Sequence, residues 1–567
     1  MGNALFIKEE GYKELKNVRV TDLKKSGTAS FFYSFALSLI SGVLFGLSFP
    51  MWLNIPTGIL AWFALVPMLI SLRGVPNFKT YFFLTFPFLI VSVYILCSFV
   101  AAFGFAAWFF SGFSQTLLIY PTFIIHYFLQ KRFGWKRALL AFPFLYTFGD
   151  WLQHLAPHSF QITSPAYTQT TVLWFAQYAD IFGMYGITFW VIALNVSLAI
   201  SIERFQNKMV RTQNIAPLKK ILLFFKSWAG QGVLFLGLPL VYSFWSNLQL
   251  LEGKFVKVAL VQTNVDSREK IDSVKFNKNI TDLIRLATQA AENKPDLIIL
   301  PESALQIPLM QNREAFKLLC NYVANTNASV AVGFPEFPDT ANYKILYNSA
   351  FVLTPQLASA WDSLGKKTSD LKVYRKQHPM PFTEMMPYRG FINLPKLFGS
   401  ETLSGDETYV FSFPDSFDHE IKTSMTICWE QMFGETQAEL AVQGAQFFSQ
   451  MNNDGWFGNS SGAAFLLNIN RMRAIENRRT VARSSNTGIS CFIDPFGKLY
   501  GVLSPQLEGV KAERVYLNSD LTFYTVHKNW FPKFCGLVLS LVVVFWLLVN
   551  RRRLLINQQL STNNQQL

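Results

Sequence analysis

Cysteine and histidine are scarce in this chain, which contains five Cys and six His among 567 residues. Cys97 and Cys535 fall in or beside apolar stretches, and the chain shows no disulfide framework. A bond between Cys320 and Cys491 stays open. The absence of a Cys-x-x-Cys pair and the scatter of the histidines argue against a zinc site, so we expect no metal.

Charged residues are also scarce, at 15% of the chain, whereas 51% of the residues are hydrophobic and 56 are Phe. This composition is typical of a membrane protein rather than of a series of soluble domains. Residues 252–520 hold 27 Lys or Arg and 29 Asp or Glu, which gives a net charge of −2. Because the whole chain carries +14, the remaining residues carry a net charge of +16. Because the basic charge belongs to the apolar part, we expect no nucleic-acid partner.

Long apolar stretches recur before residue 250 and once near the C-terminus. Eight of them are long enough to cross the ~30 Å hydrocarbon core of a bilayer. They lie near residues 30–48, 55–72, 80–103, 104–129, 138–155, 172–200, 229–247 and 534–549. Asp150 and His154 interrupt the fifth stretch. The pattern predicts a seven-helix membrane domain over 30–249 and a C-terminal transmembrane helix over 531–550.

Lysine and arginine gather in alternate loops between these stretches. They occupy residues 1–29, the second, fourth and sixth loops and the tail 551–567, whereas the odd-numbered loops before residue 250 contain none. By the positive-inside rule we predict that 1–29 and 551–567 are cytoplasmic and that 250–530 lies outside. A long charged segment precedes the first span, which predicts an uncleaved anchor rather than a cleaved signal peptide.

The region 250–530 alternates strand-like and helical patterns, which predicts an α/β domain. The expected strands lie near 255–263, 296–300, 329–333, 346–354, 423–428, 446–450 and 488–493. The expected helices lie near 274–292, 311–326, 433–443 and 462–483. The fold class is therefore a multi-pass α-helical membrane domain joined to an α/β domain.

Three residues in the α/β region suggest catalysis by a cysteine nucleophile. Cys428 ends the apolar run that starts at Met425, and Glu302 follows the buried-looking run 298–300. A free thiol has a pKa of ~8.5 and attacks only as thiolate, so acyl transfer needs a base and a cation for the oxyanion. Glu302 and Lys376 supply these groups. Taken singly, each of the three is more often a packing or surface residue, but the ends of two buried strands are a usual address of α/β active sites.

Several sequence blocks around these residues resemble the carbon-nitrogen hydrolases of the nitrilase superfamily. The chain is more closely similar to the bacterial apolipoprotein N-acyltransferases, which carry such a domain on membrane helices. The blocks are Val258-Ala259-Leu260-Val261-Gln262, Pro301-Glu302-Ser303, Tyr347-Asn348-Ser349, Lys376 to Glu384, Cys428-Trp429-Glu430, Asn452 to Phe457, and Arg471 to Gly488. The resemblance implies an α-β-β-α sandwich on the periplasmic side of the bacterial inner membrane.

The resemblance also implies the reaction and its partners. Glu302 takes the proton from Cys428, and the thiolate attacks an ester of a membrane phospholipid donor to give a thioester. Lys376 and the backbone N–H of Trp429 hold the oxyanion. The α-amino group of a diacylglyceryl lipoprotein acceptor then attacks the thioester, and no cofactor is expected because this step is downhill. Oligomeric state stays open.

Three further residues have two readings each, and a fourth departs from the family pattern. Glu384 matches a family carboxylate that orients Lys376, or is a solvated loop residue. Glu430 positions the nucleophile, or pairs with Arg473 or Arg479. Asn348 donates a hydrogen bond in the site, or caps a turn. Trp429 stands where the family commonly has Tyr.

The apolar, Pro- and Gly-containing segment 382–398 is interpreted as a lid or lipid-facing loop, with core packing as the alternative. Two further departures from the family pattern are Lys270-Ile271, where the family has Lys-Trp, and Asp150-Trp151, where it has Glu-Trp.

Two other functions remain as alternatives to acyl transfer. A membrane-anchored amidase or nitrilase would use the same triad but let water reach the thioester first. A transporter with an external binding domain would need more buried charges in the spans than Asp150, Asp180 and a few others. Seven helices exceed what anchoring alone requires, which favours a lipid-handling transferase.

Overall fold

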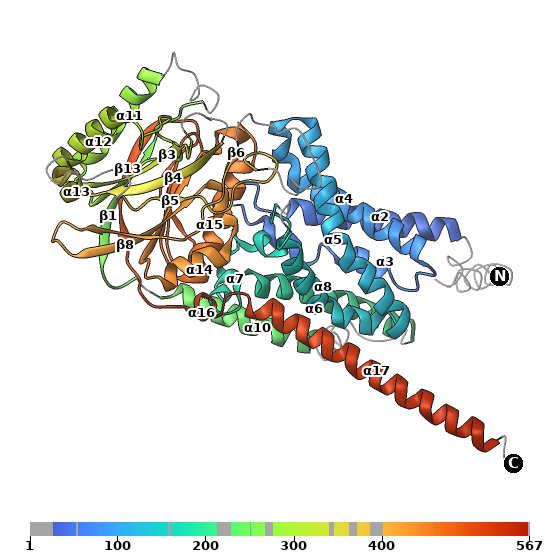
Figure 1. The fold of residues 1–567 in the computed structure, drawn as a ribbon. Helices are drawn as coiled ribbons and strands as arrows, with labels where there is room; N and C mark the ends of the chain where they lie inside the picture. The colour runs from blue at the N-terminus through green and yellow to red at the C-terminus, as the bar shows by residue number, and fades with distance from the viewer. Residues whose placement is uncertain are drawn as a thin grey trace, which may run out of the picture.

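The computed structural model divides the chain into a layered α/β domain and a group of long helices (Figure 1). It describes residues 27–52, 55–156, 160–211, 228–249, 251–266, 276–339, 345–361, 371–385 and 401–564. Residues 1–26 of the predicted segment 1–29, the Lys270-Ile271 pair and residues 386–398 of the predicted lid lie outside the described residues.

The helices before residue 250 form one packed group with the last helix of the chain running beside it (Figure 1). The helices before residue 250 are α2 (Gly27–Leu47), η2 (Thr57–Trp62), α3 (Val66–Ser71), α4 (Phe78–Leu96), η3 (Cys97–Phe103), α5 (Phe105–Phe133), α6 (Trp135–His154), η4 (Pro165–Gln169), α7 (Leu173–Ala176), α8 (Ala179–Arg211) and α10 (Trp228–Asn247). The last helix of the chain is α17 (Trp530–Asn564). The membrane character expected from composition thus takes the form of a helical bundle.

Five of the described helical segments are long and apolar enough to cross a membrane: Ser30–Leu47, Phe78–Phe103, Phe105–Phe133, Ala179–Asn207 and Trp530–Arg551. The predicted span near 55–72 is instead a short apolar segment made of η2 and α3. The predicted span 138–155 is α6, which carries Lys136, Arg137 and Asp150, and 229–247 is α10. Helices therefore occupy all eight expected positions, while eight crossings and the domain limits stay predictions.

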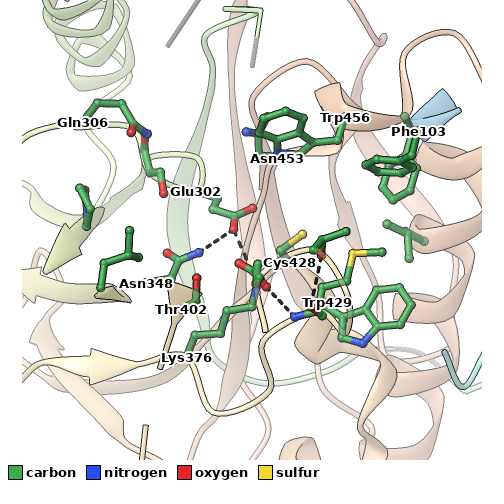
Figure 2. A pocket seen from close by; sticks show the side chains of 18 residues that line it. Phe103, Glu302, Gln306, Asn348, Lys376, Thr402, Cys428, Trp429, Asn453 and Trp456 are labelled. Carbon is green, nitrogen blue, oxygen red and sulfur yellow. Dashed lines mark hydrogen bonds and ion pairs between the residues drawn. The ribbon is translucent and has the colours of Figure 1, made fainter. Parts of the chain in front are cut away.

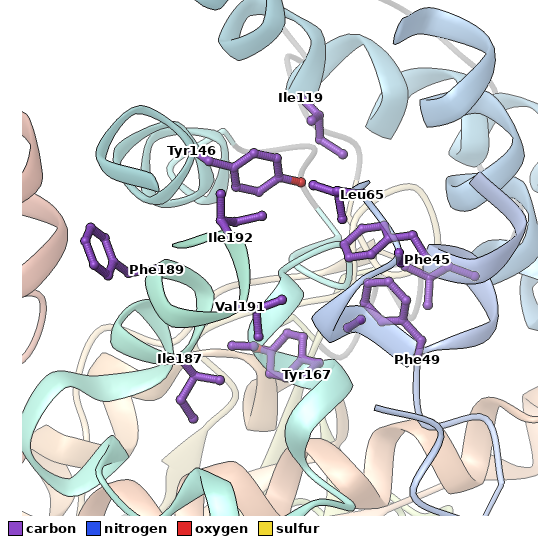
Figure 3. Close-up of a cluster of buried hydrophobic side chains, with 14 of the residues drawn as sticks. Phe45, Phe49, Leu65, Ile119, Tyr146, Tyr167, Ile187, Phe189, Val191 and Ile192 are labelled. Carbon is purple, nitrogen blue, oxygen red and sulfur yellow. The ribbon is translucent and has the colours of Figure 1, made fainter. Parts of the chain in front are cut away.

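Aromatic and branched side chains fill the interior of this helix group (Figure 3). Phe45 of α2 packs edge-on against Phe49, which follows that helix, with 5.5 Å between ring centroids. Phe45 also lies 6.0 Å from Phe88 of α4 between ring centroids. The same buried cluster continues into Phe465 and Ile469 of the α/β domain. The two parts of the chain therefore share one apolar interior.

The α/β domain contains two sheets. The first has the order β13-β1-β2-β3-β4-β5, with β6 also paired to β4, and the second has the order β12-β11-β10-β9-β8-β7. The first sheet comprises β1 (Phe255–Gln262), β2 (Leu297–Ile299), β3 (Ser329–Glu336), β4 (Ile345–Leu353), β5 (Tyr374–Arg375), β6 (Glu401–Thr402) and β13 (Gly509–Tyr516). The second comprises β7 (Val410–Pro414), β8 (Glu420–Ile427), β9 (Phe447–Asn452), β10 (Val481–Ser485), β11 (Ser490–Ile493) and β12 (Leu499–Leu503).

Helices cover the outer face of each sheet, so the layers run α-β-β-α as expected (Figure 1). The helices α11 (Phe276–Glu292), α12 (Arg313–Thr326) and α13 (Pro355–Ala360) belong to the first sheet's side. The helices α14 (Gly434–Val442) and α15 (Gly462–Asn477) belong to the second, and α15 contacts α8 of the helix group.

One predicted element in this domain is wrong at its end. The helix expected over 462–483 stops at Asn477, and residues 481–485 form strand β10. Arg478 ends the helix because its φ of 50° is left-handed and cannot continue an α-helix. Val481 pairs in parallel with Phe448 of β9, so the sheet captures the rest of the segment.

A set of polar bonds joins the α/β domain to the helix group. Arg478 donates to Asp180 Oδ2 at 2.7 Å and to the Gln177 carbonyl oxygen at 2.8 Å, and Tyr242 donates to the same Asp180 oxygen at 2.7 Å. A buried ion pair lies next to it, with Arg473 Nε 2.9 Å from Glu476 Oε2. Charges this well paired hold the two parts in a fixed relation.

The helix ends remote from the α/β domain gather cations. Glu203 lies 3.3 Å from Arg73 and 2.8 Å from Lys136, and Arg132 donates to Asn550 at 3.2 Å. The basic second, fourth and C-terminal loops of the sequence therefore meet at one end of the bundle.

The pairing left open between Cys320 and Cys491 is absent. Both are buried cysteines outside any disulfide, one on α12 and the other on β11.

Candidate active site

Glu302, Lys376 and Cys428 meet although each follows a different strand. Glu302 lies just beyond β2, Lys376 follows β5, and Cys428 follows β8 of the other sheet. Figure 2 shows their side chains converging in one pocket with Asn348 and Trp429. The site is thus built where strands of both sheets end.

Cys428 occupies a sharp strand-to-helix turn. It begins the 3₁₀ helix η7 (Cys428–Met432) and has a φ of 52°, a left-handed value that is uncommon for a residue with a side chain. Such strain often marks functional positions. The turn also leaves the first N–H groups of η7 without intrahelical acceptors, and one of them belongs to Trp429.

The thiol of Cys428 is protonated at rest. Burial raises its pKa well above the ordinary value, and the nearby Glu302 carboxylate raises it further while Lys376 acts in the opposite direction. A hydrogen bond joins the Cys428 side chain to Glu302. The thiol therefore needs a base at the moment of attack, and Glu302 is in contact with it.

Glu302 is a buried carboxylate with a raised pKa, mainly because of desolvation and in spite of the opposing effect of Lys376. Asn348 Nδ2 donates to Glu302 Oε1 at 2.8 Å, and Lys376 Nζ lies 3.8 Å from the same oxygen. Asn348 sits within β4, not at a turn, so the structure supports its hydrogen-bonding reading.

Lys376 is a buried cation held by two carboxylates. Its Nζ lies 2.7 Å from Glu384 Oε2 and 3.8 Å from Glu302 Oε1. Burial alone would lower the pKa of Lys376, but Glu384 and Glu302 together outweigh it and raise the pKa, so the amine stays charged. The backbone N–H of Met380 donates to Glu384 Oε2 at 2.7 Å, which fixes the carboxylate against the lysine. Glu384 therefore orients Lys376.

The backbone around Lys376 is also fixed. Its N–H donates to the Asn348 carbonyl at 2.9 Å, and its own carbonyl accepts from Gly405 N at 2.8 Å. A Cβ on Gly405 would lie 2.2 Å from the Arg375 carbonyl oxygen, so only glycine allows this approach.

Glu430 is fully buried and its oxygens accept four hydrogen bonds. Oε1 accepts from Tyr374 Oη at 2.6 Å, Gln377 N at 2.7 Å and His378 N at 3.2 Å, and Oε2 accepts from Ile427 N at 2.8 Å. These bonds tie the Lys376 segment to the Cys428 turn. The pairing of Glu430 with Arg473 or Arg479 is wrong, because Arg473 pairs with Glu476 and Arg479 donates to backbone carbonyls.

A cavity of about 220 Å³ opens beside Cys428. Its polar wall includes the catalytic candidates, and its apolar wall includes Trp429, Met380 and Leu466. Phe103 of η3, from the helix group, also lines it and packs edge-on against Phe457 at 5.5 Å. The helix group thus supplies part of the wall of the candidate active site.

The sequence did not identify several lining residues, among them Phe103, Gln306 and Thr402. Phe103 and Thr402 are distant in the chain from every catalytic candidate, and only tertiary structure brings them near. Asn453 and Trp456 come from a block quoted for its family resemblance, and the structure places both in the wall. Among the described residues no group of His, Cys, Asp and Glu could hold a metal ion.

Comparisons with known proteins match both parts of the chain. The carbon-nitrogen hydrolase family matches residues 257–517, and the apolipoprotein N-acyltransferase N-terminal domain matches residues 41–197. The apolipoprotein N-acyltransferase of Chlorobaculum tepidum is 30% identical over 517 residues, covering 88% of this chain and 94% of that protein. That of Geobacter metallireducens is 28% identical over 517 residues, covering 88% and 93%. A solved nitrilase-superfamily protein from Saccharomyces cerevisiae is 17% identical and covers 47% of this chain and 92% of its own, with a TM-score of 0.34.

Proposed function

The chain belongs to the apolipoprotein N-acyltransferase family, and on that premise we propose that it moves an acyl chain from a glycerophospholipid to a lipoprotein N-terminus through a thioester on Cys428. The acceptor is the α-amino group of an S-diacylglyceryl cysteine. The enzyme is an acyltransferase, and lipoprotein N-acylation is its general activity.

In the first half-reaction, the Cys428 sulfur forms a bond to the ester carbonyl carbon of the donor while its proton passes to Glu302. The carbonyl oxygen becomes an oxyanion beside Lys376 Nζ and the Trp429 N–H. When the tetrahedral intermediate collapses, the ester C–O bond breaks, and Glu302 returns the proton to the departing lysophospholipid oxygen. The acyl group remains on sulfur.

In the second half-reaction, the acceptor amine attacks the thioester carbonyl and passes a proton to Glu302. The C–S bond breaks, the proton returns to Cys428, and the product is an amide. The chain then returns to its starting state, so the kinetics are expected to be ping-pong.

One observation carries this proposal: the protonated thiol of Cys428 is hydrogen-bonded to Glu302 in a cavity that also holds the charged Lys376 and is walled by Phe103 of the helix group. A hydrolase acting on soluble amides has no need of a wall from membrane helices. This favours transfer over the amidase or nitrilase alternative.

Intact mass spectrometry tests the proposal. Purified protein incubated with a phospholipid should gain the mass of one acyl chain, and a diacylglyceryl peptide should then remove it as the N-acyl product. The Cys428→Ala variant is the control and should gain nothing. Release of free fatty acid in place of N-acyl peptide would establish hydrolysis, and no adduct on the parent chain would reject the thioester mechanism.

We further propose that the chain resides in the inner membrane with both termini cytoplasmic and the α/β domain on the periplasmic side. The cations gathered at the far end of the bundle support this orientation. A reporter active only outside the cytoplasm should work when fused near residue 365 and fail near residue 213 or after 553. Activity at 213 would overturn the orientation.

A further inference from the structure

A second cavity of about 200 Å³ lies between the α/β domain and the helix group. Helices α6 and α8 form one side of it, and the start of α14, the short helix α16 (Phe523–His527) and Asn529 form the other. None of its lining residues lines the cavity at Cys428. The catalytic mechanism therefore leaves this second cavity unused.

Three polar side chains in the second cavity have no hydrogen-bond partner among the described residues. Asn529 is 5% exposed and Tyr524 is 2% exposed, and both side chains line the cavity. Glu435, in the first turn of α14, also lines it and is solvent-exposed, which places it at the opening. Because these side chains line the cavity, a ligand bound there can form hydrogen bonds with their polar atoms.

The chemistry of the lining favours a cation. The three polar groups offer a carboxylate, an amide oxygen and a hydroxyl oxygen. The remaining lining includes the aromatic rings of Trp151, Tyr185 and Phe433 and the polar side chains of His154, Gln161, His378 and Thr436. No Lys or Arg lines the cavity. The nearest guanidinium, that of Arg473 behind Gly434, is already paired with Glu476. A primary ammonium has three donors and no acceptor, and aromatic rings attract cations.

Exposed apolar side chains lie on segments that line the second cavity. Leu155 lines the cavity and is 59% exposed, and Phe523 and Val526, on either side of the lining Tyr524 in α16, are 48% and 52% exposed. Exposed apolar side chains beside a polar pocket are typical of a surface that meets lipid. We propose that the second cavity binds the primary ammonium headgroup of a membrane lipid, with Glu435 as its counter-ion, at a site distinct from the reacting ester.

Lipid binding to the Cys428→Ala protein in detergent tests this site without turnover. Native mass spectrometry should show phosphatidylethanolamine retained more strongly than phosphatidylcholine, whose headgroup lacks N–H donors, and phosphatidylglycerol, which lacks an ammonium. Glu435→Gln should weaken one phosphatidylethanolamine site about tenfold or more. Glu439→Gln is the matched control, because Glu439 lies one turn later on α14 and pairs with Lys528 at 3.6 Å outside the cavity.

Identical binding curves for the Glu435→Gln and Glu439→Gln variants would overturn the proposal. If Glu435→Gln weakens only a diacylglyceryl peptide with a free amine, the cavity holds the acceptor and the lipid assignment is wrong. The proposed function is judged separately, because Glu435→Gln in a chain with Cys428 intact should still form the acyl adduct.

An independent observation concerns the carbonyl of Cys428. Gln450 of β9, which lies opposite Thr426 of β8, donates from Nε2 to the Cys428 carbonyl oxygen at 3.2 Å. Thr426 Oγ1 donates to Gln450 Oε1 at 2.6 Å, and Gln437 Nε2 of α14 donates to Thr426 Oγ1 at 3.0 Å. All three side chains are at least 98% buried.

The direction of this chain is fixed by chemistry. A carbonyl only accepts, so Gln450 must present its amide nitrogen to Cys428 and its oxygen to Thr426. The single hydroxyl proton of Thr426 then goes to Gln450, which leaves the hydroxyl oxygen to accept from Gln437. We infer that Gln450 is a positioning residue that holds the left-handed Cys428 peptide, and with it the Trp429 N–H, in the reactive geometry.

Thr426→Val tests the chain, because it keeps the shape of the side chain but cannot donate to Gln450. Acyl-enzyme formation should slow by roughly ten- to a hundredfold with KM unchanged, since small misplacements at a reacting centre are costly. Thr426→Ser should restore the rate. The matched control is Thr423→Val, which removes a buried hydroxyl bonded to Ser449 at 2.8 Å between the same two strands. Equal rates for Thr426→Val and Thr423→Val would reject the role of Gln450.

Discussion

Two buried carboxylates near Cys428 differ in what surrounds them. The oxygens of Glu430 accept four hydrogen bonds, three of them from backbone N–H groups. Glu302 contacts the Cys428 thiol, Asn348 and the ammonium of Lys376, and it faces the cavity. A carboxylate that accepts from fixed backbone donors stabilises a geometry, whereas one next to a thiol and an open cavity is available for proton transfer. Burial alone therefore does not distinguish the candidate base, Glu302, from the structural carboxylate of Glu430.

The strongest test of this difference is Glu302→Gln. The amide keeps the size of the side chain but cannot accept the thiol proton, so acyl-enzyme formation should slow by ~10²–10⁴. Quenched acylation assays followed by intact mass spectrometry would measure the rate of acyl-enzyme formation, and thermal unfolding would check the stability of the variant. A variant that acylates at the parental rate would make Glu302 a structural residue.

Replacing Lys376 tests whether acylation in the cavity depends on a compact positive charge. Lys376→Met removes the oxyanion partner and should reduce the acylation rate by ~10²–10³ while lipid binding stays nearly intact. Lys376→Arg keeps the charge but spreads it over a planar fork, so it should recover only part of the loss. Loss of lipid binding with chemistry preserved would reassign Lys376 to headgroup recognition.

Glu430→Gln should act mainly on stability. The new NH₂ group would face backbone donors, leaving buried groups unbonded at a cost of about 1–3 kcal/mol in the free energy of unfolding. The acylation rate of the folded fraction should fall less than in Glu302→Gln. Denaturant unfolding measures the loss of stability, and single-turnover kinetics measures the acylation rate. A Glu430→Gln variant of normal stability that acylates as slowly as Glu302→Gln would contradict the assignment of a structural role to Glu430 and a catalytic role to Glu302.

The smallest expected effect concerns His378, whose N–H also donates to Glu430. Burial, with a smaller effect of Lys376, lowers the pKa of His378 to about 4 from its ordinary 6.5. Between these values the unfolded chain binds a proton that the folded chain does not, so stability should fall as the pH drops from 6.5 towards 4. His378→Gln should flatten this part of the stability profile. An unchanged slope would assign it to other groups.

The three catalytic candidates were predictable because Glu302 and Cys428 follow buried strands, whose ends meet in α/β folds. Lys376 follows a strand of two residues, too short to recognise, so the sequence offered it by its charge and by the family resemblance and not by a strand end. The end of α15 was missed because the left-handed turn at Arg478 has no sequence signal. Phe103 and Gln450 were missed because their roles depend on pairings between distant segments.

The Phe103 wall has a consequence for the order of events during synthesis. The segment that carries Phe103 precedes the α/β domain, so it is made and inserted long before Cys428 leaves the ribosome. The cavity is therefore closed last, when the folded α/β domain reaches an aromatic surface that is already in place. An α/β domain that folds away from the helices would lack the Phe103 side of this wall, so its thiol would lie in an incomplete pocket.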